Sequence, residues 1–101
     1  QDDWLIQLRT YIINNLSHGT PSLALVSTHL SMGERTLRRK LDKKGLTYQS
    51  LIDDVRKEIA VSLVQEAKLS LMEISLLLGF AEQSSFHRAF KRWTGKTPLQ
   101  Y

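Results

Sequence analysis

The sequence predicts an all-α fold of about seven helices, in which two helical lobes are joined by one long central helix. Apolar residues recur every three or four positions along most of the chain, as amphipathic helices require. The chain also contains an internal repeat. Ser22 and Leu30 recur as Ser70 and Leu78 at an offset of 48 residues, with matching apolar positions between them.

The central helix is predicted over residues 47–68. Its apolar stripe repeats every four residues, at Leu51, Val55, Ile59 and Leu63. Gly45 can take the left-handed conformation that ends the preceding helix, and Thr47 can cap the new one. About twenty residues at about 1.5 Å each give a rod of roughly 30 Å. This length is close to one turn of B-form DNA, about 34 Å.

Caps and turn residues place the helices before this rod. A first amphipathic helix over residues 4–16 is expected only to pack, and turn residues end it. Ser22 can cap a second helix that runs through about His29. The capping-box pattern Ser31-x-x-Glu34 predicts that a third helix begins there.

After the rod the same order returns. Ser70-x-x-Glu73 is a further capping-box pattern, and another helix is predicted over residues 82–93. Pro98 then suits the first position of a last turn. We therefore expect one domain over residues 1–101. Its parts are a first lobe at 1–46, the connecting helix at 47–68 and a second lobe at 69–101.

Composition excludes several classes of function. The chain has 101 residues, of which 42% are hydrophobic, enough for one compact core. No apolar run approaches the length of about eighteen residues that spans a membrane, and no signal-peptide pattern begins the chain, so we expect a cytoplasmic protein. With no cysteine and no ligand spacing among three histidines, we expect no metal and no cofactor. No nucleophile, base and orienting group occur together, so we expect no enzyme.

Positive charge is concentrated in two segments of this chain of net charge +4. Residues 32–44 hold six basic and two acidic side chains, and residues 82–96 hold four basic and one acidic. One such run is usually only a solvated helix face. Two runs at matching places in a repeat indicate function, the more so because Arg39 matches Arg88 at an offset of 49.

Two short helices joined by a tight turn, the second one basic and exposed, describe a helix-turn-helix motif. The second helix of this motif enters the major groove of DNA, where arginine can bind guanine and lysine can neutralise phosphates. We expect one groove segment to be contacted by Arg35, Arg38 and Arg39, and another by Gln83, Ser84, His87 and Arg88.

Two alternatives stay open from the residues alone. Arg39 and Arg88 could bridge neighbouring carboxylates instead of contacting DNA. The whole domain could also be a helical module that binds a protein or structured RNA through its two basic segments. A-form RNA, however, has a major groove too narrow to admit a reading helix.

Two stretches of this chain resemble the DNA-binding domain of the AraC/XylS family of bacterial transcription regulators. They are RTLRRKLDKKGLTYQSLIDDVR and SLMEISLLLGFAEQSSFHRAFKRWTGKTPLQY, and the resemblance covers about residues 22–101. It implies sequence-specific binding of double-stranded promoter DNA by two recognition helices, which regulates transcription. It also implies a sensing or dimerising domain outside this sequence, so that the fragment would be monomeric and the full chain dimeric.

The resemblance also implies which residues contact DNA. The set that the resemblance implies is Arg35, Thr36, Arg38 and Arg39 in the first lobe, and Gln83, Ser84, Ser85, His87 and Arg88 in the second. We add Lys43 and Lys91, one in each basic segment, as DNA-contacting lysines. Ala81 departs from the family pattern, in which a serine or an acidic residue is common at this place. RNA polymerase is the implied partner of the full regulator, and the bacterial nucleoid its implied place in the cytoplasm.

Overall fold

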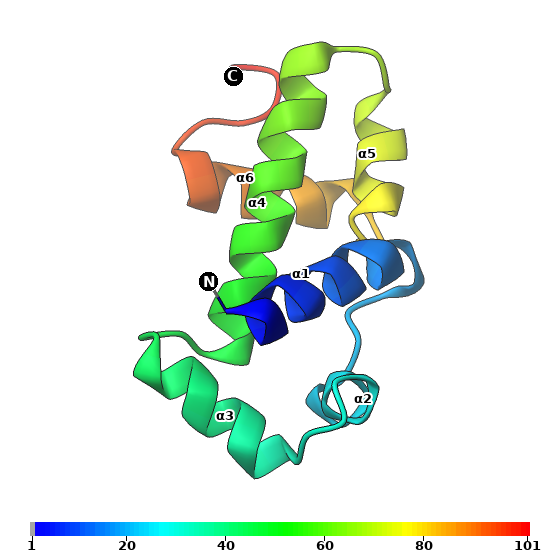
Figure 1. Ribbon diagram of the computed structural model, residues 1–101. Helices are drawn as coiled ribbons and strands as arrows, with labels where there is room; N and C mark the ends of the chain where they lie inside the picture. The colour runs from blue at the N-terminus through cyan, green and yellow to red at the C-terminus, as the bar shows by residue number, and fades with distance from the viewer. Residues whose placement is uncertain (1) are drawn as a thin grey trace.

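The computed structural model describes residues 2–101, which form six α-helices and one 3-10 turn (Figure 1). The elements in order are α1 (Asp3–Asn15), η1 (Leu16–His18), α2 (Leu23–His29), α3 (Glu34–Lys43), α4 (Tyr48–Glu66), α5 (Leu71–Leu77) and α6 (Gln83–Thr94). The predicted all-α fold is confirmed. The last predicted turn is a hydrogen-bonded turn and not a helix, in which the Gln100 N–H donates to the Thr97 carbonyl at 3.0 Å.

Helix α4 runs through the middle of the molecule and packs against α1, α5 and α6 (Figure 1). It begins at the predicted cap, because the Thr47 hydroxyl accepts from the Ser50 N–H at 3.0 Å and the Ser50 hydroxyl accepts from the Thr47 N–H at 3.0 Å. Ala67 takes a left-handed conformation after its last residue. Its 19 residues correspond to a length of about 28 Å.

We call α2 with α3 the first motif, and α5 with α6 the second motif. Both first helices are capped as predicted. The Ser22 hydroxyl accepts from the Leu25 N–H at 3.1 Å, and the Ser70 hydroxyl accepts from the Glu73 N–H at 3.1 Å. The Glu73 carboxylate accepts in turn from the Ser70 N–H at 2.9 Å. Hydrogen bonding to Ser70 lowers the pKa of Glu73, with the backbone N–H as the larger cause and the hydroxyl as the smaller.

The predicted capping box at the start of α3 is wrong. Gly33 precedes the helix, and no side chain caps it. Ser31 instead forms the turn of the first motif, with a φ of 56°. Gly79 occupies the matching place in the second motif, with a φ of 82°. The pattern misled because the left-handed turn residue lies three positions before the helix, and that residue is Ser31.

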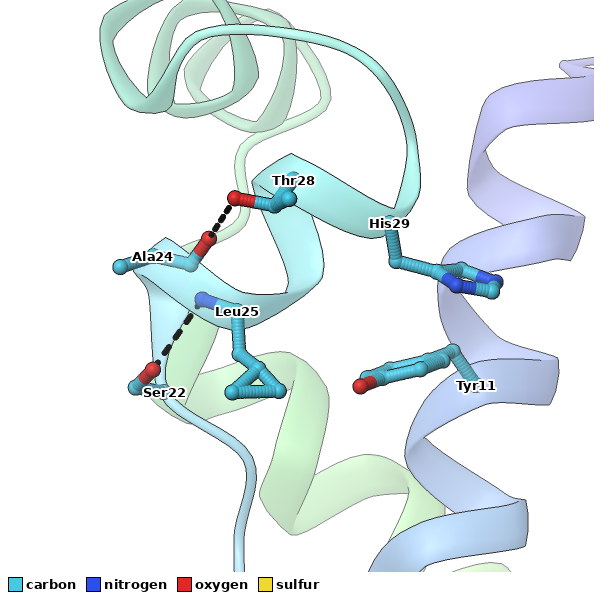
Figure 2. A pocket seen from close by; sticks show the side chains of 6 residues that line it. All are labelled: Tyr11, Ser22, Ala24, Leu25, Thr28 and His29. Carbon is cyan, nitrogen blue, oxygen red and sulfur yellow. Dashed lines mark hydrogen bonds between the residues drawn. The ribbon is translucent and has the colours of Figure 1, made fainter.

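The first motif packs on α1 through a shallow hollow (Figure 2). The Tyr11 ring of α1 stacks on the His29 ring of α2, with 4.2 Å between centroids and 30° between planes. The Ser22 cap and a hydrogen bond from the Thr28 hydroxyl to the Ala24 carbonyl hold the backbone of α2 beside this stack (Figure 2). The hollow is thus a packing seam between α1 and α2.

One continuous apolar core serves both motifs. Its buried members come from α1 and η1, α2, α3, α4, α5 and α6, and include Leu8, Ile12, Leu16, Val26, Leu37, Leu41, Leu51, Ile52, Val55, Ala60, Ile74, Leu78, Phe86 and Phe90. Helix α1 packs on both α2 and α4, and η1 packs on α5. Helix α1 therefore links the first motif to α4. The position of the second motif depends on this shared core as well as on the length of α4.

Candidate nucleic-acid interface

Helix α3 turns its apolar residues inward and its arginines outward. Leu37 and Leu41 are fully buried, whereas Arg35, Arg38 and Arg39 are exposed. This division follows from the helical period, since residues four apart share a face. Thr36 is half-buried and Lys43 is exposed on the same helix. All five predicted contact residues of the first lobe therefore reach the surface of α3.

The other two cations of the first basic segment have partners. The Lys40 ammonium lies over the ring of Trp4 at 5.5 Å from its centroid, and Lys44 forms an ion pair with Asp2. The hydrogen bond from Lys44 lowers the pKa of Asp2. Within residues 2–101, none of the α3 arginines forms an ion pair. The segment thus divides into cations that hold α1 and cations that face solvent.

Helix α6 presents a less charged surface. It buries Phe86, Ala89 and Phe90. Its exposed contact candidates are Ser84, Arg88 and Lys91, and its half-buried ones are Gln83, Ser85 and His87. The helix begins at Gln83 after Glu82, whose side chain makes no cap and instead accepts from the Ser84 hydroxyl at 3.3 Å.

The polar side chains of α6 support one another along the helix. The Gln83 amide nitrogen lies 3.2 Å from the His87 Nε2, one turn further on. An Arg88 Nη donates to the Ser85 hydroxyl at 3.4 Å. Such side-chain pairs limit the rotamers of the residues that face outward. Helix α6 therefore presents polar side chains that pair with one another, whereas within residues 2–101 the α3 guanidinium groups form no ion pair.

Arg39 and Arg88 occupy equivalent places in the two motifs. The flanking residues share the offset of 49, because buried Leu37 and Leu41 match buried Phe86 and Phe90. Both arginines are exposed, and among residues 2–101 neither one bridges a carboxylate. The structure thus disagrees with the alternative in which these two arginines serve ion pairs.

The two groups of candidate residues lie on separate parts of the molecule. Figure 1 shows α3 beyond the N-terminal end of α4 and α6 crossing behind α4 further along. The structure gathers the first-lobe set on α3 and the second-lobe set on α6, and does not merge them into one cluster.

Sequence reasoning missed one functional candidate, the half-buried Arg56 of α4. Its side chain reaches Thr20 and Phe80, which lie far from it in the sequence. The periodicity of α4 shows only that Arg56 lies beside the apolar stripe. The one signal in the sequence that could have singled out Arg56 is that it corresponds to the apolar Leu8 at the repeat offset of 48 residues.

Within residues 2–101, no three acidic or histidine side chains are placed to hold a metal ion. None of the helices described is both long enough and apolar enough to cross a bilayer.

A model of the family described as "Helix-turn-helix domain" matches residues 26–101, which include the second motif, α4, α3 and all but the first three residues of α2. This chain is an AraC/XylS-type helix-turn-helix domain. It belongs to a family of DNA-binding domains of transcription regulators and not to a family of enzymes.

Relatives and solved structures agree with this assignment. The chain is 47% identical over 81 residues to the ornithine utilization regulator of Pseudomonas aeruginosa, a match that covers 80% of this chain and 24% of that protein. A DNA-binding transcriptional dual regulator from Escherichia coli K-12 aligns with a TM-score of 0.85 and 27% identity, over 100% of this chain and 96% of the other.

The DNA-binding domain of AdpA, solved with a target DNA, shares the fold at a TM-score of 0.77 and 22% identity, over 99% of this chain and 90% of that one. The chain spans about a quarter of the length of the curated relatives it matches.

Proposed function

We propose that α3 and α6 enter successive major-groove segments of one promoter duplex and that the chain regulates transcription from that promoter. The observation that carries this proposal is the equivalence of Arg39 and Arg88, both exposed at the same place of a repeated motif. The DNA-contacting residues would be Arg35, Thr36, Arg38, Arg39 and Lys43 on α3, and Gln83, Ser84, Ser85, His87, Arg88 and Lys91 on α6.

The two helices would read DNA by different chemistry. The free guanidinium groups of α3 suit the paired acceptors of guanine and the phosphates beside them. On α6, Gln83 can form a bidentate contact with adenine, and Arg88 can bind guanine. We therefore propose a composite site, with a guanine-rich segment under α3 and a mixed segment under α6.

Family membership, together with the short span of this chain relative to its relatives, supports a proposal for the organisation and partners of the full regulator. We propose lobes at residues 1–46 and 69–101 on the connecting helix 47–68, and a monomeric fragment. The full regulator would dimerise through another domain, contact RNA polymerase, and act in the cytoplasm on nucleoid DNA.

A pair of arginine variants tests this proposal. A preferred duplex is first selected from a random pool, and affinity is then measured for Arg39→Ala, Arg88→Ala and the control Lys57→Ala. Each arginine change should weaken binding to the selected site by about 1–3 kcal/mol, and should weaken binding to random DNA much less. Lys57 is an exposed cation beside Asp54 and Glu58, so its loss should leave affinity nearly unchanged.

Two results would contradict the proposal. Equal losses on selected and random DNA would mean that the arginines only contact phosphates. Equal binding of duplex RNA and duplex DNA across a salt series would favour the RNA- or protein-binding module instead, because A-form RNA does not admit a reading helix.

A further inference from the structure

The internal repeat extends beyond the two motifs to the helices that precede them. Gly19 after η1 and Ala67 after α4 lie 48 residues apart, and both have a positive φ, of 100° and 56°. Ile12 and Ala60, at the same offset, are both fully buried. Helix α1 therefore precedes the first motif in the same way that α4 precedes the second motif, and the two helices are equivalent in the repeat.

At this offset Arg56 of α4 corresponds to Leu8 of α1. Leu8 is fully buried in the core, so an apolar side chain fills this place in the first half. In the second half the place is taken by a guanidinium group, which is half-buried. Its Nε is buried and has no hydrogen-bond partner among residues 2–101, and burial lowers the pKa of Arg56. Burying a charged group whose hydrogen bonds are not all made costs free energy, whereas burying a leucine does not carry this cost.

Arg56 reaches what a leucine could not. One Nη donates to the Thr20 hydroxyl at 3.2 Å, in the connection that leads into the first motif. The guanidinium carbon lies 4.5 Å from the centroid of the Phe80 ring, in the turn of the second motif. The same Nη lies 3.5 Å from where a β-carbon on Gly79 would be. One side chain therefore contacts the lead-in of one motif and the turn of the other.

We propose that Arg56 is a positioning residue, which fixes the orientation of the second motif relative to the first and thereby sets the spacing of the two DNA segments. Without it, the shared core would still hold both halves, but the turn at Phe80 would no longer be tied to Thr20. This inference rests on the proposed two-segment binding, and its experiment separates the two.

The test compares Arg56→Leu with Lys57→Leu, which removes the same charge from the neighbouring exposed position of α4. Affinity is measured on the selected duplex and on versions with single base pairs inserted between the two segments. The wild type and Lys57→Leu should bind one spacing best. Arg56→Leu should lose about tenfold in affinity at that spacing and show a flatter preference, with binding to each isolated segment unchanged.

A second readout does not use DNA. The chain has no cysteine, so Asp42→Cys and Lys91→Cys, at equivalent exposed places on α3 and α6, accept two spin labels. The distance distribution between the labels should be broader in Arg56→Leu than in Lys57→Leu. Thr20→Val, an exposed change that removes only the acceptor, should alter spacing preference and distance in the same direction by a smaller amount.

An unchanged spacing preference and distance distribution in both Arg56→Leu and Thr20→Val would overturn the inference. If Arg56→Leu does not fold, Thr20→Val decides alone. A wild type indifferent to spacing would instead overturn two-segment binding, a failure visible before any variant is made.

Discussion

The two motifs share one backbone plan but differ in how their turns are built. The same backbone hydrogen bond closes both turns. The Met32 N–H donates to the Ser27 carbonyl at 3.0 Å in the first motif, and the Phe80 N–H donates to the Ser75 carbonyl at 3.0 Å in the second. The left-handed residue between the helices is an exposed serine in the first motif. In the second motif it is Gly79, which lies against the rest of the molecule.

This difference shows where each motif meets its neighbours. A β-carbon built on Gly79 would lie 2.3 Å from the Leu16 carbonyl oxygen of η1. The second turn is therefore part of the junction between the halves, whereas Ser31 at the first turn faces solvent. The same backbone geometry can accept a side chain in one place and exclude it in the other.

Gly79→Ala should have the largest effect on stability. It combines a left-handed backbone, unfavourable for a β-carbon by about 1–2 kcal/mol, with an overlap against backbone that costs about 1–3 kcal/mol more. Urea unfolding should show a loss of about 2–5 kcal/mol. The matched control Ser31→Ala changes an exposed residue already in this conformation and should shift stability by less than about 0.5 kcal/mol. Equal losses in both variants would show that the turns do not differ.

Tyr48→Phe should have an intermediate effect, confined to the exit of the first motif. The Tyr48 hydroxyl donates to the Pro21 carbonyl at 2.7 Å, and the matching residue after the second motif, Pro98, has no such donor. Loss of this hydrogen bond should lower the free energy of unfolding by about 1 kcal/mol at neutral pH.

Tyr48 also predicts a pH dependence. Burial, with a smaller effect of Tyr11, raises its pKa from 10.0 to about 12. Since the folded-state pKa lies above the unfolded one, the contribution of the neutral phenol is complete below about pH 10 and declines as the pH rises towards 12. Denaturant titrations across this range should show a steeper decline in the wild type than in Tyr48→Phe. Parallel curves would contradict the assignment.

Ser31→Gly should have the smallest effect, and a stabilising one. It relieves the left-handed strain of about 1–2 kcal/mol but adds backbone entropy to the unfolded chain, worth about 0.4–1 kcal/mol. The two ranges leave a net gain of about 0–1.6 kcal/mol, with a midpoint of about 0.8 kcal/mol, which is best measured as a rise in melting temperature. A loss of stability would indicate that the Ser31 side chain makes a contact of its own in solution.

The elements were predictable from sequence where local signals act alone. The periodicity of Leu51, Val55 and Leu63 located α4 to within two residues at each end, and the Ser22 and Ser70 caps located α2 and α5. The exposed face of α3 was also predictable, because Leu37 and Leu41 are four residues apart and mark the buried face. These features depend on residues a few positions apart, which a sequence shows directly.

Contacts between distant segments were not predictable in the same way. Nothing local shows that Lys40 lies over Trp4, that Lys44 pairs with Asp2, or that Arg56 reaches Thr20. The first two of these contacts decide which cations of the first basic segment remain free for a ligand. The predicted cap of α3 was wrong because Ser31 could serve either as a cap or as a turn residue, and in the structure it is the left-handed turn residue while Gly33 precedes the helix.

Helix α1 lies outside the stretch matched by the family model, yet Leu8 and Ile12 fill the centre of the core. A fragment trimmed to begin at residue 26 would keep both reading helices while baring the apolar flank of α4 that α1 covers. Anyone shortening this domain for crystallisation or for fusion to another sensor should accordingly keep Asp2, which precedes α1 and pairs with Lys44, since similarity to relatives marks the ancestry of a segment and not the minimum that folds.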